Sequence, residues 1–84
     1  MDSKLAKDVE RLAADAVELG DEIELASEDD ATPEVIEQAR RMMADFLDQY
    51  NSLLDKLEPD DKAKVQRSIG NKVERFNNSL GKLR

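Results

Sequence analysis

The amino-acid sequence predicts an all-α fold, an antiparallel up-down-up three-helix bundle with coiled-coil-like packing. Apolar residues recur at alternating steps of three and four along most of the chain, which is the period of a helical seam. Gly, Pro and aromatic residues are few while charged residues are abundant, a balance typical of helices rather than of β-sandwiches or barrels. The 84 residues correspond to one small domain.

The first helix is expected over residues 3–27. Asp2 or Ser3 can cap its start, because a side-chain oxygen there accepts a hydrogen bond from a free backbone N–H. Gly20 costs about 1 kcal/mol relative to Ala inside a helix, so a shorter helix that ends near Leu19 is the alternative. We favour one unbroken helix because the apolar positions keep their register beyond Gly20. These positions are Leu5, Val9, Leu12, Ala16, Leu19, Ile23 and Ala26.

The second helix is expected over residues 33–57. Thr32 can be its cap and Pro33 fits the first helical position. Pro59 closes the segment, since the residue before a proline is pushed out of the helical region. Two apolar stripes give this helix the wide face that a middle helix needs to contact two neighbours. One stripe is Ile36, Ala39, Met43, Phe46, Tyr50, Leu53 and Leu57, and the other is Val35, Met42, Leu47 and Leu54.

The third helix is expected over residues 60–82. Asp60 and Asp61 suit its first turn, where carboxylates meet the positive end of the helix dipole. Gly81 marks the expected C-terminal cap. Its apolar positions are Val65, Ile69, Val73, Phe76, Leu80 and Leu83.

Three helices of similar length with short connections favour the up-down-up bundle. In this arrangement Gly70 falls near Phe46 and Tyr50, so its missing side chain can admit an aromatic ring. The alternative is an extended helical hairpin that completes its core by dimerising.

Charge is distributed unevenly along the chain, whose net charge is −7. Residues 1–30 carry a net charge of −8, residues 31–58 carry −3 and residues 59–84 carry +4. Because the first and third helices of an up-down-up bundle are parallel neighbours, we expect partly exposed ion pairs between them. Arg75, Lys82 and Arg84 would supply the cations at the level of residues 15–24, and each pair would contribute about 0–1 kcal/mol.

Ten acidic residues and no cation lie within residues 13–38, and six of them define the acidic tip. A solvated turn and a contact surface for a basic partner protein are the leading interpretations. A mimic of nucleic acid is a third. A calcium site is a fourth, but the alternating acids and central Gly of an EF-hand loop are missing. The acidic tip consists of Asp21, Glu22, Glu24, Glu28, Asp29 and Asp30.

A second charged surface, the basic stripe, follows the third helix at steps of three and four, opposite its apolar positions. Such side chains can hold phosphates or carboxylates. The alternative is a solubilising outer face. The net negative charge and the lack of interleaved aromatic residues count against general nucleic-acid binding. The basic stripe consists of Lys64, Arg67, Asn71, Arg75, Asn78 and Lys82.

Several function classes find no support. The chain has no His and no Cys, which removes the usual general base, disulfides and the commonest zinc ligands. No P-loop or nucleophile–base pattern is present. We therefore expect no catalytic residue, no enzyme activity, no metal and no cofactor. The N-terminal stretch MDSKLAKDVE lacks the apolar core of a secretory signal, and no apolar run approaches a membrane span. We expect a cytoplasmic protein without membrane association.

The sequence thus predicts a non-catalytic acidic helical module that binds another protein through charged surfaces, as an adaptor, a regulator or a small inhibitor of a larger machine. The expected partner is a protein with a basic surface, and the chain itself is expected to be a monomer or a weak homo-oligomer. One alternative is a nucleic-acid-linked role, as a polyanion mimic at the acidic tip or as an RNA or DNA contact at the basic stripe. Another is a self-assembling structural protein, in which opposite charges on different surfaces pair head to tail between copies.

Overall fold

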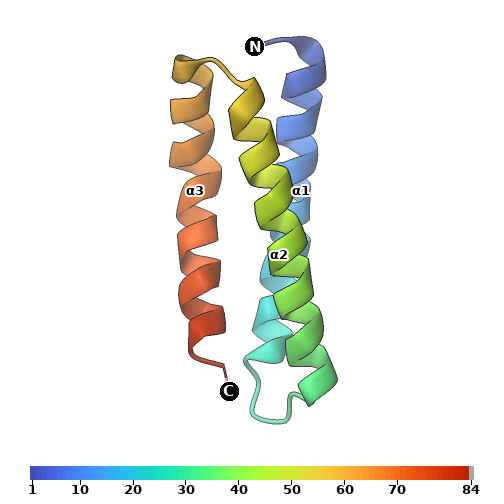
Figure 1. Cartoon of the computed structure of the whole chain (residues 1–84). Helices are drawn as coiled ribbons and strands as arrows, with labels where there is room; N and C mark the ends of the chain where they lie inside the picture. Colours follow the sequence, from blue (N-terminus) through green and yellow to red (C-terminus); the bar gives the residue numbers. More distant parts are fainter. Residues whose placement is uncertain (84) are drawn as a thin grey trace.

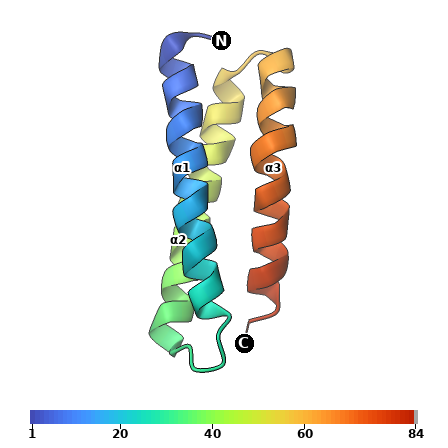
Figure 2. The same cartoon turned by 180° about the vertical axis from the view of Figure 1, so that it is seen from behind.

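The computed structural model describes residues 1–83 and contains three α-helices, α1 (Ser3–Ala26), α2 (Pro33–Lys56) and α3 (Pro59–Gly81). They run up, down and up along a rod of 44 × 19 × 16 Å, so that α1 and α3 are parallel (Figure 1). From the opposite side, α1 and α3 lie next to each other and α2 lies behind them (Figure 2). All three helices pack on one another, which confirms the three-helix bundle and makes the dimer-dependent hairpin wrong.

Local chemistry explains where α1 and α2 begin. The Asp2 carboxylate accepts a hydrogen bond from the Lys4 backbone N–H at 2.7 Å. The Thr32 hydroxyl accepts one from the Val35 backbone N–H at 3.3 Å. Each side chain satisfies a donor that the first turn leaves without a helical partner. The expected Thr32 cap is confirmed, and Asp2 rather than Ser3 caps α1.

The junction between α2 and α3 lies one residue earlier than expected. Only Leu57 and Glu58 separate the two helices, and Pro59 is the first residue of α3. Proline suits this position because its fixed φ is helical and its missing N–H has no partner to lose in the first turn. The expected start of the third helix at residue 60 is therefore one residue too late.

The expected ends at residues 27, 57 and 82 are also one residue too late, because Ser27, Leu57 and Lys82 are C-cap residues that flank the helices. The expected cap at Gly81 is wrong. Gly81 is the last helical residue, and Lys82 follows it with right-handed backbone angles. No residue in the described range has a positive φ, so the left-handed glycine termination does not form there.

Helix α1 continues through Gly20, as expected. Ile23 and Ala26 beyond it are 4% and 2% exposed. Burial contributes about 0.8 kcal/mol per CH₂ group, so these two side chains outweigh the roughly 1 kcal/mol cost of a helical glycine. A Cβ at Gly20 would lie 3.4 Å from two ring carbons of Phe76 on α3, which is ordinary van der Waals contact.

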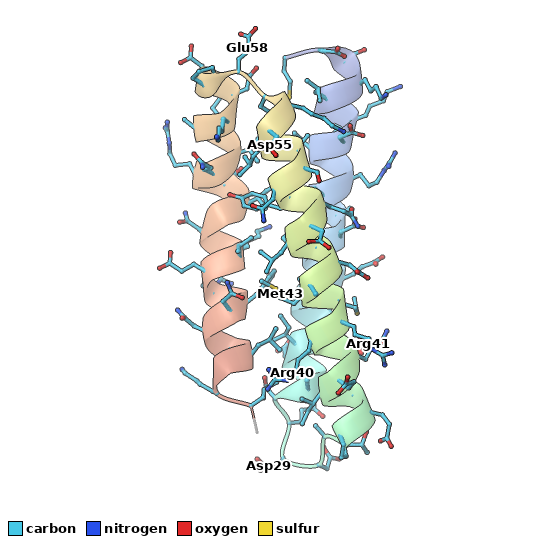
Figure 3. All side chains as sticks on the ribbon, viewed as in Figure 1. Asp29, Arg40, Arg41, Met43, Asp55 and Glu58 are labelled. Atoms are coloured by element: carbon cyan, nitrogen blue, oxygen red, sulfur yellow. The ribbon has the colours of Figure 1, made fainter. Side chains whose placement is uncertain are left out.

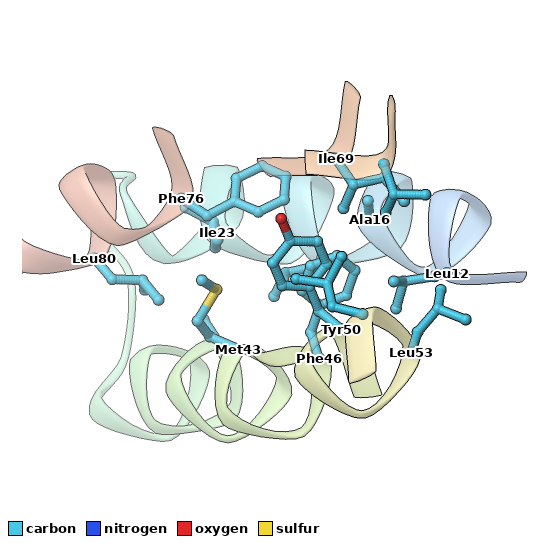
Figure 4. Packing of buried hydrophobic residues seen from close by; sticks show 14 of the residues in the cluster. Leu12, Ala16, Ile23, Met43, Phe46, Tyr50, Leu53, Ile69, Phe76 and Leu80 are labelled. Atoms are coloured by element: carbon cyan, nitrogen blue, oxygen red, sulfur yellow. The ribbon is translucent and has the colours of Figure 1, made fainter. Parts of the chain in front are cut away.

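The core extends along the bundle axis and contains the apolar seams that the spacing predicts (Figure 4). Phe46 and Tyr50 lie at its centre with nearly parallel rings whose centroids are 6.5 Å apart. Several predicted core positions are only half-buried, because they lie at the ends or edges of the bundle. These are Leu5, Val9, Val35, Ile36, Met42, Leu47, Val73 and Leu83. On α1 the buried residues Leu12, Ala16, Leu19, Ile23 and Ala26 alternate steps of four and three, which confirms coiled-coil-like packing.

Candidate protein-interaction surfaces

The acidic tip lies at the end of the rod where α1 meets the loop to α2. Asp21, Glu22 and Glu24 occupy the last turns of α1, and Glu28, Asp29 and Asp30 form the loop. Five of the six residues are exposed, and Glu22 is half-buried. The label on Asp29 in Figure 3 marks this end, opposite the end that carries Glu58. The structure thus brings the six predicted residues together.

The electrostatic surroundings of the acidic tip are unfavourable. The loop carboxylates follow the C-terminus of α1, where the helix dipole is negative, and the last turn of α1 contains no basic residue. The last carbonyls of α1 are satisfied locally, since the Ser27 backbone N–H and hydroxyl both donate to the Ile23 carbonyl oxygen, at 3.0 and 2.8 Å. The cost at this end is therefore repulsion between charges rather than unpaired backbone groups.

The expected ion pairs between α1 and α3 are absent from the described residues. The one ion pair within residues 1–83 joins the Met1 amino group to Asp61 at 3.6 Å, at the other end of the rod. Arg75 and Lys82 are exposed and lie beyond ion-pair distance of the α1 carboxylates. The expected pair of Arg84 lies outside the described residues. The reason is packing, because α1 contacts α2 more extensively than it contacts α3.

The basic stripe follows α3 along most of its length. All six of its residues are exposed. The Asn71 side-chain amide donates a hydrogen bond to the Arg67 carbonyl oxygen at 2.7 Å, so part of that amide is engaged by its own helix. The four cations Lys64, Arg67, Arg75 and Lys82 form no ion pair with any described residue.

A groove of about 510 Å³ lies between α1 and α3, the two helices that lie next to each other in Figure 2. Its α1 wall carries Asp21 and Glu24, and its α3 wall carries Lys72 and Arg75. Phe76 contributes to its floor. Val17 lines it with 60% of its surface exposed. The sequence did not predict this groove. Arg75 was expected in the basic stripe and in ion pairs with the first helix, and Lys72 was assigned to neither.

One sequence signal points to this groove in retrospect. Every seventh residue on the α3 side of α1 is small, in the order Ala6, Ala13, Gly20 and Ser27. Small residues at heptad spacing give one side of a helix short side chains. A neighbouring helix can then pack closely against that side, or a groove remains between the two helices.

Two smaller grooves lie between α1 and α2. One of about 280 Å³ has a balanced rim of two acids and two bases. The other, of about 210 Å³, has three carboxylates above an apolar floor. The first rim consists of Asp8, Arg11, Asp48 and Lys56. The second groove is lined by Asp15, Glu18 and Asp45 with Leu19, Met42 and Phe46.

Arg40 makes a long-range contact that the sequence did not reveal. Its guanidinium donates hydrogen bonds from α2 to the carbonyl oxygens of Leu80 and Leu83, at 3.5 and 3.2 Å. Figure 3 shows this side chain directed to the C-terminal end of α3, whereas Arg41 points away from the bundle. A cation here meets carbonyl oxygens at the negative end of the α3 dipole. Arg40 thus stabilises the structure and is not available to neutralise the acidic tip.

The one polar side chain at the centre of the core belongs to Tyr50. Its hydroxyl is directed to α3, and a Cβ at Gly70 would lie 3.0 Å from that oxygen (Figure 4). The expected placement of Gly70 beside an aromatic ring is therefore confirmed. Burial raises the pKa of the Tyr50 hydroxyl above its usual value of 10.0, because the phenolate would lose solvation.

Comparison with protein families assigns the chain. The family model described as the embryogenesis-like protein helical domain matches residues 4–84. The chain belongs to this family. No curated protein and no solved structure shows a significant match.

The match to the embryogenesis-like protein helical domain spans all three helices, and with them the acidic tip, the basic stripe and the groove. Its description names a helical domain, which suggests a protein-interaction type of domain and specifies no partner. Within residues 1–83, no helix combines the length and apolar character that a membrane-crossing segment requires. The same residues contain no group of three or more His, Cys, Asp or Glu placed to hold a metal ion.

Proposed function

We propose that this embryogenesis-like helical domain is a non-catalytic module that binds a second protein with a basic surface at the acidic tip. The observation that carries the proposal is the environment of Glu28, Asp29 and Asp30. These carboxylates are exposed, and no cation of the described residues lies within ion-pair distance of them. A module of this kind acts as an adaptor, a regulator or a small inhibitor of a larger protein machine.

Electrostatics supports a basic partner. The loop carboxylates repel one another and the negative end of the α1 dipole, so bringing cations to them removes an unfavourable interaction of the free protein. A concentrated negative surface also steers a positively charged partner during diffusion, which raises the association rate most at low ionic strength. Binding at the acidic tip should therefore weaken as salt is added.

A role without catalysis is supported by the residue types and by the grooves. The chain has no His or Cys, and none of its Ser or Thr residues can pair with an imidazole base. The grooves described above lie on the surface of a bundle whose interior is filled with apolar side chains. We find no water-excluding pocket on the described chain in which paired carboxylates could do acid–base work.

The basic stripe supports a second candidate, a nucleic-acid contact. Its four cations are exposed, free of ion pairs within residues 1–83 and arranged along one side of α3. Phosphate contacts of this type are independent of base sequence and depend strongly on salt. The net charge of −7 opposes such binding, and we therefore rank it second.

The test is affinity capture from a lysate of the source organism with three forms of the protein. The wild type is compared with Glu28→Gln/Asp29→Asn/Asp30→Asn and with a control, Glu10→Gln/Asp48→Asn/Asp55→Asn. Both variants change the net charge equally, and every substituted residue is exposed. Each lysate is divided and half is treated with nuclease.

We expect the wild type and the control to retain a set of basic proteins that the tip variant loses, with or without nuclease. Recovery of the same proteins by all three forms would show that the acidic tip is not the contact. Loss of the captured proteins after nuclease treatment would instead favour the nucleic-acid role. A gel shift with mixed RNA and DNA, using Lys64→Glu/Arg67→Glu as the comparison, then tests the basic stripe directly.

A further inference from the structure

We propose that the groove between α1 and α3 binds a second copy of this chain, to form a parallel two-fold dimer. This inference does not depend on the proposed function. It uses Asp21 and Glu24 of the acidic tip in the groove, and it leaves for a partner the loop carboxylates Glu28, Asp29 and Asp30, which carry the proposed function. It also differs from the head-to-tail assembly considered above, since the two copies lie side by side.

The walls of the groove carry matched but separated charges. Asp21 and Glu24 lie on the α1 side, and Lys72 and Arg75 lie on the α3 side. None of these four side chains forms an ion pair with a described residue, so each wall retains its charge. The groove as a whole is neutral, whereas the complete chain has a net charge of −7. A second copy can therefore approach here without the repulsion that most of the surface would cause.

Symmetry makes this groove complementary to itself. α1 and α3 run in parallel, and Gly20 of α1 lies level with Phe76 of α3, whose ring an added Cβ would meet. Asp21 and Arg75 each lie one residue from this level and are close in height, whereas Glu24 lies nearer one end of the groove and Lys72 nearer the other. A two-fold axis that runs parallel to the helices, just outside the groove, exchanges left and right but keeps height. The α1 wall of one copy then faces the α3 wall of the other, and an acid meets a base on both sides.

The antiparallel alternative brings like charges together. A two-fold axis perpendicular to the helices would place α1 against α1 and α3 against α3. It would also separate the C-terminal end of each α1, which carries Asp21 and Glu24, from the C-terminal half of the partner's α3. That half carries Lys72 and Arg75, the basic residues of the groove. Like charges opposed across an interface cost free energy, so the pattern selects the parallel arrangement.

The α1 wall of the groove also offers an apolar contact. Val17 on this wall is 60% exposed, although most other large apolar residues of the chain are at least partly buried. In the proposed dimer, Val17 of each copy would face the α3 wall of the other copy. Gly20 and Ser27 lack bulky side chains, so the backbone of a second copy can come close and exclude water from the ring edge of Phe76.

The test uses reversed charges on one wall at a time. Lys72→Glu/Arg75→Glu makes both walls acidic, and Asp21→Lys/Glu24→Lys makes both walls basic. Lys64→Glu/Arg67→Glu is the matched control, because it makes the same charge change on α3 outside the groove. Sedimentation equilibrium over a wide concentration range gives the dimer dissociation constant, and circular dichroism verifies that each variant remains helical.

We expect the wild type and the control to dimerise and each groove variant to dimerise at least about tenfold more weakly. Mixing the two groove variants should restore association as a heterodimer, since an all-basic groove then faces an all-acidic one. A wild type that stays monomeric at every concentration and ionic strength overturns the proposal. So do groove variants that dimerise as well as the wild type. If the wild type is monomeric, the groove is open to a helix of another protein.

Single cysteines test the parallel geometry, because the chain has no other Cys. Ser27 and Ser79 line opposite walls of the groove. In the parallel dimer, a mixture of Ser27→Cys and Ser79→Cys chains should form a disulfide-linked heterodimer faster than either variant links to itself. Faster linkage of Ser27→Cys to itself would contradict the proposed axis. The tip variant Glu28→Gln/Asp29→Asn/Asp30→Asn should dimerise normally, which separates this proposal from the proposed function.

Discussion

At the scale of single residues, Tyr50 and the two helical glycines show how closely α3 is fitted to the other helices. Gly20 and Gly70 both occupy helix interiors, where glycine is unfavourable relative to alanine. Their surroundings differ in one respect. A Cβ added at Gly20 would lie 3.4 Å from the ring of Phe76, an ordinary contact distance. A Cβ added at Gly70 would lie only 3.0 Å from the Tyr50 hydroxyl oxygen, which is too close.

Alanine substitutions should therefore have different effects at the two sites. Gly20→Ala is expected to raise the free energy of unfolding by about 0.5–1 kcal/mol, because helix propensity improves without a clash. Gly70→Ala is expected to be less stable than Gly20→Ala by about 1 kcal/mol or more, because Tyr50 must shift in a packed core. Urea unfolding of the two variants measures the difference.

Tyr50→Phe provides the control for this prediction. It removes the oxygen that the new Cβ would meet, and the next atom is then 4.0 Å away on Gln66 of the same helix. In the Tyr50→Phe background, Gly70→Ala should gain stability as Gly20→Ala does, and a double-mutant cycle isolates the coupling. If Gly70→Ala raises stability fully while Tyr50 is present, the close contact does not exist.

The ionisation of Tyr50 gives a pH prediction. Burial raises the pKa of Tyr50 in the folded state above its unfolded value near 10. The native state thus binds this proton more tightly, so its contribution to stability is complete below pH 10 and is lost as the pH rises through the folded pKa. We expect wild-type stability to fall more steeply than that of Tyr50→Phe above about pH 10.

The titration can be observed directly, because Tyr50 is the only tyrosine and the chain has no tryptophan. Ultraviolet absorbance of the phenolate should give a higher pKa in the folded protein than in urea. Equal values in the two states would contradict the burial of this hydroxyl.

At the scale of secondary-structure elements, the C-terminal end of α3 depends on a side chain from α2. The last turn of α3 contains no basic residue, and Arg40 supplies the missing cation from the neighbouring helix. The guanidinium adds a second donor to the Leu80 carbonyl oxygen, which already accepts from the Leu83 backbone N–H, and it also donates to the Leu83 carbonyl oxygen just beyond the helix. The starts of α1 and α2 are determined locally by their caps, whereas this end is determined by packing.

Arg40→Met should lower the free energy of unfolding by about 0.5–1.5 kcal/mol, because two hydrogen bonds and the dipole interaction are lost while the aliphatic stem remains. Arg41→Met is the matched control. Arg41 is adjacent and exposed, and it donates no hydrogen bond to the described residues, so its change should stay within about 0.5 kcal/mol. Urea unfolding gives both values.

Amide hydrogen exchange locates the effect. Protection should fall in the last turn of α3 in Arg40→Met and remain unchanged in the middle of that helix. Equal loss of stability in the two methionine variants would show that Arg40 has no special role.

At the scale of the whole molecule, the helices of the rod carry net charges of opposite sign. The α1–α2 pair carries the negative charge, and α3 carries a net positive charge. Since the described residues contain one ion pair, the helices are held together by their apolar seams rather than by pairing of opposite charges. The uncompensated charge of −7 then acts as self-repulsion that opposes the compact state.

Salt should therefore stabilise the protein. Raising the ionic strength from about 0.01 to 0.15 M shortens the Debye length from roughly 30 to 8 Å and screens this repulsion. We expect the melting temperature to rise over this range. The tip variant Glu28→Gln/Asp29→Asn/Asp30→Asn should start from a higher melting temperature and respond less to salt than the control Glu10→Gln/Asp48→Asn/Asp55→Asn. A melting temperature that falls with salt would mean that attractive charge pairs dominate.

The helices were predictable from the chain because their causes are local. The seam spacing, the Thr32 cap and the position of Pro33 depend on neighbours within a few residues, so the helix bounds agree with the structure to within one residue. The up-down-up arrangement also followed, because two short connections between helices of similar length leave few other ways to bury three apolar faces.

The side-chain environments at the surface were not predictable in the same way. Three features depend on the distance between the helices and on the rotation of each helix about its own axis. They are the absence of α1–α3 ion pairs among the described residues, the contact of Arg40 with the end of α3, and the groove that separates Asp21 and Glu24 from Lys72 and Arg75. Periodicity reveals which face of a helix turns inward, but it does not contain the distance to the next helix. Residue spacing alone thus specified three amphipathic helices and their charges, and only the packed bundle decided which charges remain open to a partner.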